Sequence, residues 1–339
     1  MNRRIFLLGS AVAAACSNRP RLNVLNWSDY VAADTIPNFE REFGIHVRYG
    51  TFESVPEMLA KVMGGNSGWD VVFPSAEYIQ PMRDLGLLAP LRHERLPNLD
   101  ALDTPFRAPP WDPELRWSVP YMHGTTGIVY QKSLPQPVRA WTDLWDARLA
   151  GKITMLDDPP EVFGACLKLL GYSLNSGDPV QLKQAQQQAI AQKKLVRAYL
   201  NAEVRDQLVA GDVAAAQAWA VTAGQAIAAV PDKLAYAFPA EGFARYADNM
   251  AMLRESGRVE AAHKFLNYLL RPEVAAAIVA ATRTATANGA AQKLLPDAIR
   301  QDPVLYPPAE TLARGEWFAP QSAASQKLRA RLWTEVKSA

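Results

Sequence analysis

Asp157-Asp158-Pro159-Pro160-Glu161-Val162-Phe163 joins a short apolar run, 152–156, to a segment whose apolar residues recur at helical spacing. This pattern predicts a strand that passes directly into a helix, with Asp158 and Glu161 at the junction. One interpretation is structural, because Asp-x-x-Glu with proline at the first helical positions is typical of a capping box. The other is functional, because open α/β sheets bind ligands beyond the carboxyl ends of their strands. Both interpretations stay open from this segment alone.

The composition of the 339-residue chain is that of a globular protein with room for two domains, since 49% of the residues are hydrophobic. The net charge is only +2 and no basic run stands out, which argues against nucleic acid as a partner. The two cysteines, Cys16 and Cys166, and the four histidines show no metal-binding spacing. We therefore expect neither a metal nor a cofactor.

The first sixteen residues have the pattern of an export signal. Arg3-Arg4 provides a positive start, and the apolar run 5–15 is too short to span a bilayer permanently. Arg3-Arg4-Ile5-Phe6-Leu7 resembles the twin-arginine signal, and Ala13-Ala14-Ala15-Cys16 resembles a bacterial lipobox. The alternative is an ordinary secretory signal with an incidental cysteine. We expect a signal peptide over 1–16 with lipidation at Cys16, hence a periplasmic, membrane-anchored protein without disulfides in which Cys166 is a small buried residue.

Strands and helices alternate in the first part of the mature chain. Strands are predicted over 21–26, 45–49 and 70–73, with helices over 37–43 and 55–63 between them. This rhythm predicts an α/β fold with a parallel, doubly wound sheet. Strand ends at Trp27, Ser75 and Leu156 should therefore open toward one crevice.

A long extended stretch, 117–130, follows a segment rich in proline and tryptophan. It contains Gly124 and Gly127, and its length predicts a strand that leaves one lobe and enters another, with a hinge near 123–127. Segment 246–253 is predicted to return to the first lobe. The other expected elements are a helix starting at Thr142, a surface helix over 179–196, a buried strand over 214–219, and apolar helices over 259–270 and 273–281.

Several of these segments resemble the periplasmic polyamine-binding proteins of bacterial ABC importers, in the spermidine/putrescine receptor group. The segments are 25–31, 70–72, 157–163, 264–274 and 315–317, and the resemblance runs through nearly all of 22–337. It implies a two-lobed, type II-like periplasmic binding protein with a parallel-rich sheet in each lobe. Lobe 1 would comprise 20–124 plus 247–288, and lobe 2 would comprise 125–246 plus 289–339. Such a receptor closes on a polyamine and delivers it to an importer.

The resemblance also implies which residues bind the ligand. Buried ammonium groups require carboxylate counter-ions, and aromatic faces attract cations and cover methylene groups. Asp158 and Glu161 would hold one end of a polyamine and Asp248 another. Glu77 replaces an aromatic residue of the family, and either adds a carboxylate or points to solvent. The full predicted set is Trp27, Ser28, Tyr30, Ser75, Glu77, Asp158, Glu161, Trp219, Tyr246 and Asp248.

Two further departures leave the identity of the amine open. Phe318 stands where the family pattern has a hydrogen-bonding amide, and His123 replaces an aromatic residue at the predicted hinge. The alternatives are a receptor of the same fold for another small ligand, a sensor or adhesin, and a carboxylate-dependent enzyme. Asp158 and Glu161, three apart at one helix start, lie side by side instead of flanking a scissile bond, and no nucleophile or phosphate-loop signature is present. We therefore expect no catalysis, and a monomeric receptor whose partners are a polyamine, an importer permease and the membrane.

Overall fold

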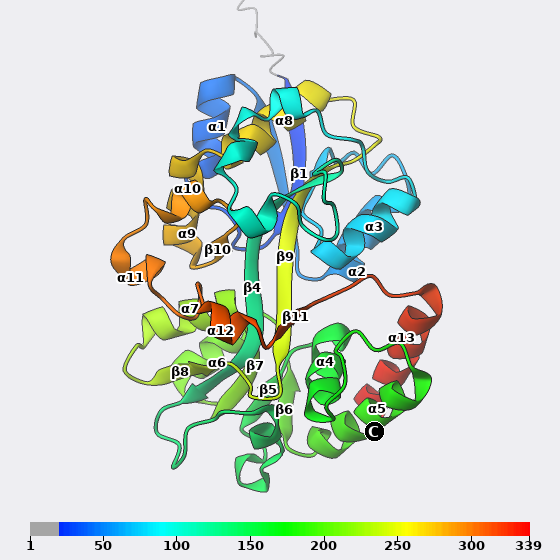
Figure 1. Cartoon of the computed structure of the whole chain (residues 1–339), viewed down its shortest axis with the longest axis vertical. Helices are drawn as coiled ribbons and strands as arrows, with labels where there is room; N and C mark the ends of the chain where they lie inside the picture. Colours follow the sequence, from blue (N-terminus) through cyan, green and yellow to red (C-terminus); the bar gives the residue numbers. More distant parts are fainter. Residues whose placement is uncertain (1–19) are drawn as a thin grey trace, which may run out of the picture.

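The structure, a computed structural model, describes residues 20–339. Two α/β lobes are joined by two long antiparallel strands, β4 (Ser118–Gln131) and β9 (Phe243–Met252), which run from one lobe into the other (Figure 1). The predicted two-lobed α/β class is confirmed. The predicted signal peptide, the twin-arginine motif and Cys16 lie outside the described residues.

The first lobe contains the parallel sheet expected from the N-terminal strand–helix alternation. Its strands are β1 (Arg21–Trp27), β2 (His46–Phe52) and β3 (Val71–Val72), in the order β2-β1-β3, and β3 then pairs antiparallel with β9. Its helices are α1 (Thr35–Phe43), α2 (Val55–Val62), α3 (Ala76–Asp84), α8 (Val259–Leu269) and α9 (Pro272–Thr282). The carboxyl ends of β1 and β3 therefore face the second lobe.

The second lobe repeats this arrangement with its own parallel strands. These are β5 (Ile153–Met155), β6 (Val196–Tyr199) and β7 (Ala215–Trp219), and β4 is antiparallel to β7 and to β8 (Leu234–Ala237). The helices are α4 (Pro159–Leu169), α5 (Pro179–Lys193), α6 (Val204–Ala210), α7 (Ala220–Ala229) and α13 (Ala323–Ser338). The predicted helix from Thr142 is instead a single 3₁₀ turn, Trp141–Trp145, because Asp143 folds back to accept the N–H of Ala140.

Strand β4 changes partners within the segment predicted as a hinge. Residues Ser118–Thr125 pair with β9, whereas Thr126–Tyr130 pair with β7. Two short strands complete the crossing region: β10 (Ala285–Thr286) pairs with β4, and β11 (Gly315–Trp317) pairs parallel with β9. The crossing is thus made of extended chain held by ladder hydrogen bonds.

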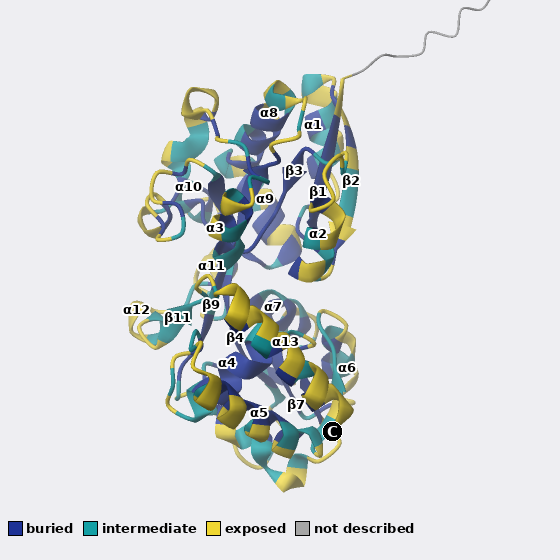
Figure 2. Ribbon diagram, turned by 90° about the vertical axis from the view of Figure 1, so that its right-hand side faces the viewer, coloured by how far each residue is buried: buried dark blue, intermediate teal, exposed yellow. Residues whose placement is uncertain are grey.

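Each lobe has a separate hydrophobic core, visible as the buried interior on either side of the crossing strands (Figure 2). Val24 and Phe265 belong to the core of the first lobe, and Phe163 and Val336 to that of the second. Burial of such side chains is the main stabilising contribution within each lobe. Because the cores are separate, each lobe is able to move as a unit.

Three short helices follow β10: α10 (Gly289–Gln292), α11 (Asp297–Arg300) and α12 (Ala309–Leu312). The predicted boundary assigned residues from 289 onward to the second lobe, but α10 packs against α9 of the first lobe. Asn288 explains this position, because its amide donates to the carbonyl of Leu270 at 2.7 Å and its oxygen caps α10 through the N–H of Ala291. The other lobe boundaries stay a prediction.

Across residues 20–339, no helix combines the length and the apolar character needed to cross a membrane.

Candidate functional site

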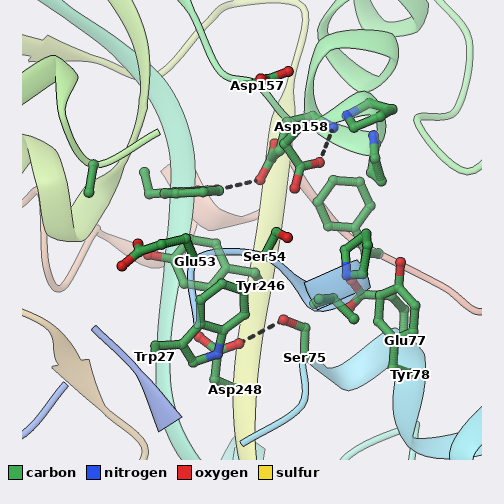
Figure 3. A pocket seen from close by; sticks show the side chains of 18 of the residues that line it. Trp27, Glu53, Ser54, Ser75, Glu77, Tyr78, Asp157, Asp158, Tyr246 and Asp248 are labelled. Atoms are coloured by element: carbon green, nitrogen blue, oxygen red, sulfur yellow. Dashed lines mark hydrogen bonds between the residues drawn. The ribbon is translucent and has the colours of Figure 1, made fainter. Parts of the chain in front are cut away.

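A cleft of about 390 Å³ lies between the lobes and is lined by residues of both (Figure 3). Every residue of the predicted site lines this cleft. The ends of β1 and β3 and the crossing strand β9 supply one wall, and the β5–α4 and β7–α7 junctions supply the other. The residues concerned are Trp27, Ser28, Tyr30, Ser75, Glu77, Asp158, Glu161, Trp219, Tyr246 and Asp248.

Asp248 lies on β9, and its side chain is held by two hydroxyl groups of the first lobe. Ser75 donates to Oδ1 at 2.7 Å and Tyr30 donates to Oδ2 at 2.9 Å. The residue is only 3% exposed, and burial raises the pKa of Asp248 to about 6, while the hydroxyl hydrogen bonds act in the opposite direction. Asp248 lies within a strand, so its carboxylate does not cap a turn.

Asp158 and Glu161 meet at the start of α4, as the sequence predicted. Asp158 is the N-cap and accepts the N–H of Glu161 at 3.2 Å. The Glu161 side chain does not return the bond; its Oε1 accepts from Thr126 at 2.7 Å and from the Trp219 indole at 2.9 Å. The pair is therefore half of a capping box, with the second carboxylate redirected toward the cleft. Burial raises the pKa of both acids, and the charge of Asp158 raises that of Glu161 further.

Glu77 lies in the first turn of α3 and lines the cleft. Its Oε2 atom is buried and has no hydrogen-bond partner within residues 20–339. Burial raises the pKa of Glu77 to about 8, and repulsion from Asp248 and Asp158 adds to the effect. The alternative that Glu77 points to solvent is therefore wrong.

None of these four carboxylates pairs with a cationic side chain of the described chain. The ion pairs within residues 20–339 involve other acids, such as Asp157 at the rim of the cleft, which pairs with Lys337 at 2.8 Å. The cleft thus gathers four acidic side chains between two apolar cores, where the field of each ionised group is weakly screened. This arrangement favours a ligand that carries several positive charges.

Aromatic side chains form the walls between the acids. The Trp27 indole donates to the carbonyl of Phe73 at 2.9 Å, and its ring packs against Phe52 with centroids 4.5 Å apart. Tyr246 is 8% exposed, and Tyr30 is anchored from behind because its carbonyl accepts the Tyr121 hydroxyl at 2.6 Å. The rings are therefore held in place by contacts made outside the cleft.

Some residues that line the cleft or support its acids were not selected by the sequence analysis. Thr126, at the point where β4 changes partners, donates to Glu161. The sequence offered one sign of this role, a hydroxyl side chain next to a glycine of the predicted hinge. Glu53 accepts a hydrogen bond from Ser28 at the rim. Arg329 of α13 lines the cleft and donates to the carbonyls of Leu174 and Ser176 at 3.0 and 2.8 Å. No local pattern links α13 to the other wall residues.

The two residues that depart from the family pattern have different positions. Phe318 lines the cleft, whereas His123 packs against Phe106 outside it, with ring centroids 4.8 Å apart. Burial and the nearby Arg245 lower the pKa of His123 to about 4, so the ring is neutral near pH 7. His123 therefore has a packing role outside the cleft.

Within the described chain, no three His, Cys, Asp or Glu side chains are placed to hold a metal ion. The Cys166 thiol is buried on α4, and burial raises its pKa, which disfavours the reactive thiolate. The prediction that Cys166 is a buried apolar residue is confirmed.

Comparison with known proteins identifies the family. Residues 35–307 match the family described as bacterial extracellular solute-binding protein. The putrescine-binding periplasmic protein PotF of Escherichia coli is 32% identical over 98% of this chain and 95% of its own. The spermidine/putrescine-binding periplasmic protein of the same organism is 34% identical over 95% of both chains.

A solved structure is similar over the same extent. The spermidine/putrescine ABC transporter substrate-binding protein PotD of Streptococcus pneumoniae has a TM-score of 0.82 and 29% identity, covering 94% of this chain and 99% of its own. The match therefore includes both lobes and the crossing strands that form the cleft. This chain belongs to the bacterial extracellular solute-binding proteins.

Proposed function

We propose that this protein is a receptor for a polyamine, which it binds outside the cytoplasm and delivers to an ABC importer. One observation carries the proposal: acids from the two lobes, Asp248 on one side and Asp158 with Glu161 on the other, face a single cleft (Figure 3). A polyamine has ammonium groups at both ends of a flexible chain. Its two ends match the two separated groups of acids.

The electrostatics of the acids favour a multiply charged amine. A buried carboxylate without a counter-ion is costly, and the raised pKa of Asp248 reflects this cost. An ammonium group removes the cost by supplying both charge and hydrogen-bond donors. The hydroxyls of Ser75 and Tyr30 keep Asp248 oriented for that contact.

The aromatic walls suit the methylene segments of the same ligand. Trp27, Trp219 and Tyr246 line the cleft between the two groups of acids. Each face in contact with a cationic chain contributes about 0.5–2 kcal/mol. Relatives named for putrescine and spermidine binding support the same ligand class.

Delivery requires that the lobes close on the ligand and are recognised in that state. The change of partners along β4 between Thr125 and Thr126 supports a hinge at 123–127. A ligand that contacts both lobes stabilises the closed arrangement by its additional contacts there. The permease of an ABC importer is the partner we propose for the closed receptor.

We place the receptor in the periplasm as a monomer, anchored through a lipid on Cys16 after export, with the twin-arginine pathway as the proposed route. The proposed location, lipid anchor and export route rest on the residues of the export signal. Replacement of Cys16 by serine should release the protein from the membrane fraction into the soluble periplasmic fraction. Retention of the C16S variant in the membrane would contradict the anchor.

The proposal also excludes an enzyme. Asp158 and Glu161 lie side by side at one helix start, and the N–H of Glu161 bonds to Asp158. A pair of catalytic carboxylates in glycoside hydrolysis instead flanks the bond that is broken. We therefore expect bound amines to be recovered chemically unchanged.

Calorimetric titration of the purified protein tests the proposed function. Putrescine, cadaverine, spermidine and spermine are the probes, with glutamate and maltose as controls for anionic and neutral ligands. We expect at least one amine to bind with a dissociation constant of about 1 µM or lower, and neither control to bind. A folded protein that binds none of the amines would contradict the polyamine proposal and leave the family assignment intact.

A further inference from the structure

Three residues that line the cleft have a buried polar atom without a hydrogen-bond partner among residues 20–339: Glu77 (Oε2), Tyr246 (hydroxyl) and Arg329 (Nε). The Arg329 side chain is held by the carbonyls of Leu174 and Ser176, so the two groups left for a ligand are those of Glu77 and Tyr246. The great majority of buried polar groups in proteins are paired, because an unpaired one loses its hydration without compensation. Both groups belong to residues that line the cleft, so a bound molecule is the natural partner for each.

The position of Glu77 distinguishes it from the other acids. It lies on α3 of the first lobe, yet its carboxyl group is repelled by Asp248 of β9 and by Asp158 at the start of α4. Glu161 of α4 is in turn repelled by Glu77. Glu77 therefore lines the same cleft as both groups of acids and is close enough for the charges of both to act on it.

Tyr246 has a similar position. The charges of Asp248 and Glu161, which lie on opposite sides of the cleft, both act on its hydroxyl. The residue is 8% exposed, and its ring lies against Gly124, where the two lobes join. The two unpaired groups thus both feel acids from the two sides of the cleft that they line.

We propose that Glu77 binds an interior ammonium group of the ligand, so that the receptor prefers a triamine to a diamine of the same length. This inference rests on the proposed function, because it names the subclass of polyamine. Terminal ammonium groups are assigned to Asp248 and to Asp158 with Glu161. A third acid in the cleft either keeps its proton or is compensated by a third positive charge on the ligand.

The proton on Glu77 should respond differently to a diamine and to a triamine. With a pKa of about 8, Glu77 carries a proton near pH 7 in the ligand-free protein. A diamine places only methylene groups beside it, so the proton stays on the carboxyl group. A triamine places a secondary ammonium there, which stabilises the carboxylate, and the carboxyl proton passes to the buffer.

Other groups near Glu77 titrate as well. The protons that they release must be subtracted when proton release on binding a triamine is compared with that on binding a diamine. Asp248, Asp158 and Glu161 lose protons when either ligand binds, since both ligands have terminal ammonium groups. Tyr78, the neighbour of Glu77 on α3, has a raised pKa and stays neutral. The difference in proton release between a triamine and a matched diamine therefore reports on Glu77.

The experiment compares spermidine with diaminooctane, in which a methylene replaces the interior nitrogen and the distance between the terminal amines is retained. Calorimetric titrations at pH 7 in two buffers of different ionisation enthalpy give both the affinity and the number of protons released. For the unaltered protein we expect spermidine to bind at least about tenfold more tightly. We also expect it to release about one proton more than diaminooctane.

The variant Glu77→Gln retains the size of the side chain and removes its charge. We expect this variant to weaken spermidine binding by about tenfold, to leave diaminooctane within about threefold, and to abolish the difference in proton release. Glu114→Gln is the matched control, because Glu114 is exposed and outside the cleft. It should behave as the unaltered protein does.

The outcomes separate this inference from the proposed function. Equal affinity and equal proton release for the two ligands in the unaltered protein would overturn the role of Glu77 and leave a polyamine receptor. Absence of binding by every amine would overturn both. The comparison on the unaltered protein stands even if Glu77→Gln does not fold.

Discussion

Gly124 on β4 lies directly opposite Tyr246 on β9, and the tyrosine ring occupies the space where a side chain at position 124 would stand. A Cβ atom at Gly124 would be 2.4 Å from the Tyr246 oxygen. Gly127 is similar, since a Cβ there would be 2.6 Å from the carbonyl oxygen of Ala237. The hinge glycines are therefore required by the close approach of neighbouring groups, and Gly124 makes room for a residue of the cleft.

Replacement of Gly124 by alanine should disturb both stability and the site. The added methyl group must displace the Tyr246 ring, and overpacking of this kind costs about 1–3 kcal/mol in the free energy of unfolding. Denaturant unfolding measures the loss of stability, and calorimetric titration with an amine that the unaltered protein binds measures the change in the site. Gly257→Ala is the control, because nothing lies within 4 Å of a Cβ at that position. Equal stability of the two variants would contradict this explanation of Gly124.

The substitution Asp248→Asn should weaken amine binding by at least about 2 kcal/mol, because a buried ammonium group loses its counter-ion. The amide keeps the size of the side chain, so the fold should be retained. Calorimetric titration of the variant measures the loss, with Asp232→Asn, an exposed residue outside the cleft, as the control. Unchanged affinity of the Asp248 variant would remove this residue from the site.

Trp219→Phe tests the hydrogen bond between the indole and Glu161 separately from the aromatic wall. The phenyl ring retains an aromatic face, whereas the carboxylate loses one of two side-chain donors. We expect amine binding to weaken by about 1–2 kcal/mol, since bonds to charged groups contribute about 1.5–3 kcal/mol and water compensates in part.

The matched control for this variant is Trp145→Phe. The Trp145 indole donates to the carbonyl of Gln188 at 3.2 Å, outside the cleft. Loss of that bond should lower stability without changing affinity. If both variants bind the amine equally well, the bond from Trp219 does not support Glu161 in ligand binding.

Affinity should rise with pH over the range in which Asp248 ionises. Its pKa of about 6 lies above the ordinary value for aspartate, and the ammonium ligand requires the ionised form. Asp248 alone makes binding about tenfold weaker near pH 5 than near pH 7. Titrations at both pH values, at constant ionic strength, test this expectation. An affinity that does not change with pH would contradict it.

The stability of the ligand-free protein should change with pH in the opposite direction. Because the folded-state pKa of Asp248 is raised, the folded protein binds the proton more tightly than the unfolded chain does. The resulting stabilisation is fully present below about pH 4, the unfolded pKa, and is lost as the pH rises through about 6. Thermal unfolding without ligand should therefore move to lower temperature across this range, and saturating amine should reduce the change. A melting temperature that rises instead would contradict the assignment.

Local patterns predicted the elements that carry the site. The first strand, the strand at Val71–Val72 and the start of α4 lie where apolar periodicity and turn residues indicated. These features depend on contacts between residues close in sequence, so they can be predicted without knowledge of the fold. The capping role of Asp158 is of this kind. The selection of the cleft residues as a set came from the resemblance to a family, and their role in binding stays a prediction.

Long-range features were the ones missed. The N–H of Glu161 is satisfied locally, but its side chain bonds to Thr126 and Trp219, which come from two different strands. Arg329 reaches the cleft from the last helix, and α10 packs on the first lobe through Asn288. No short window of sequence contains both partners of any of these contacts.

The sequence by itself determined the α/β class, the strand-to-helix junctions and the two acids at the start of α4, because hydrophobic periodicity and capping act over a few residues. Only the tertiary structure decided that Asp248 and Asp158 face one cleft, since β4 and β9 bring the two lobes together. Only it decided that the Oε2 atom of Glu77 is buried, because Glu77 lines the cleft between the lobes. The charge state of these acids depends on that burial, and burial is a property of the assembled fold.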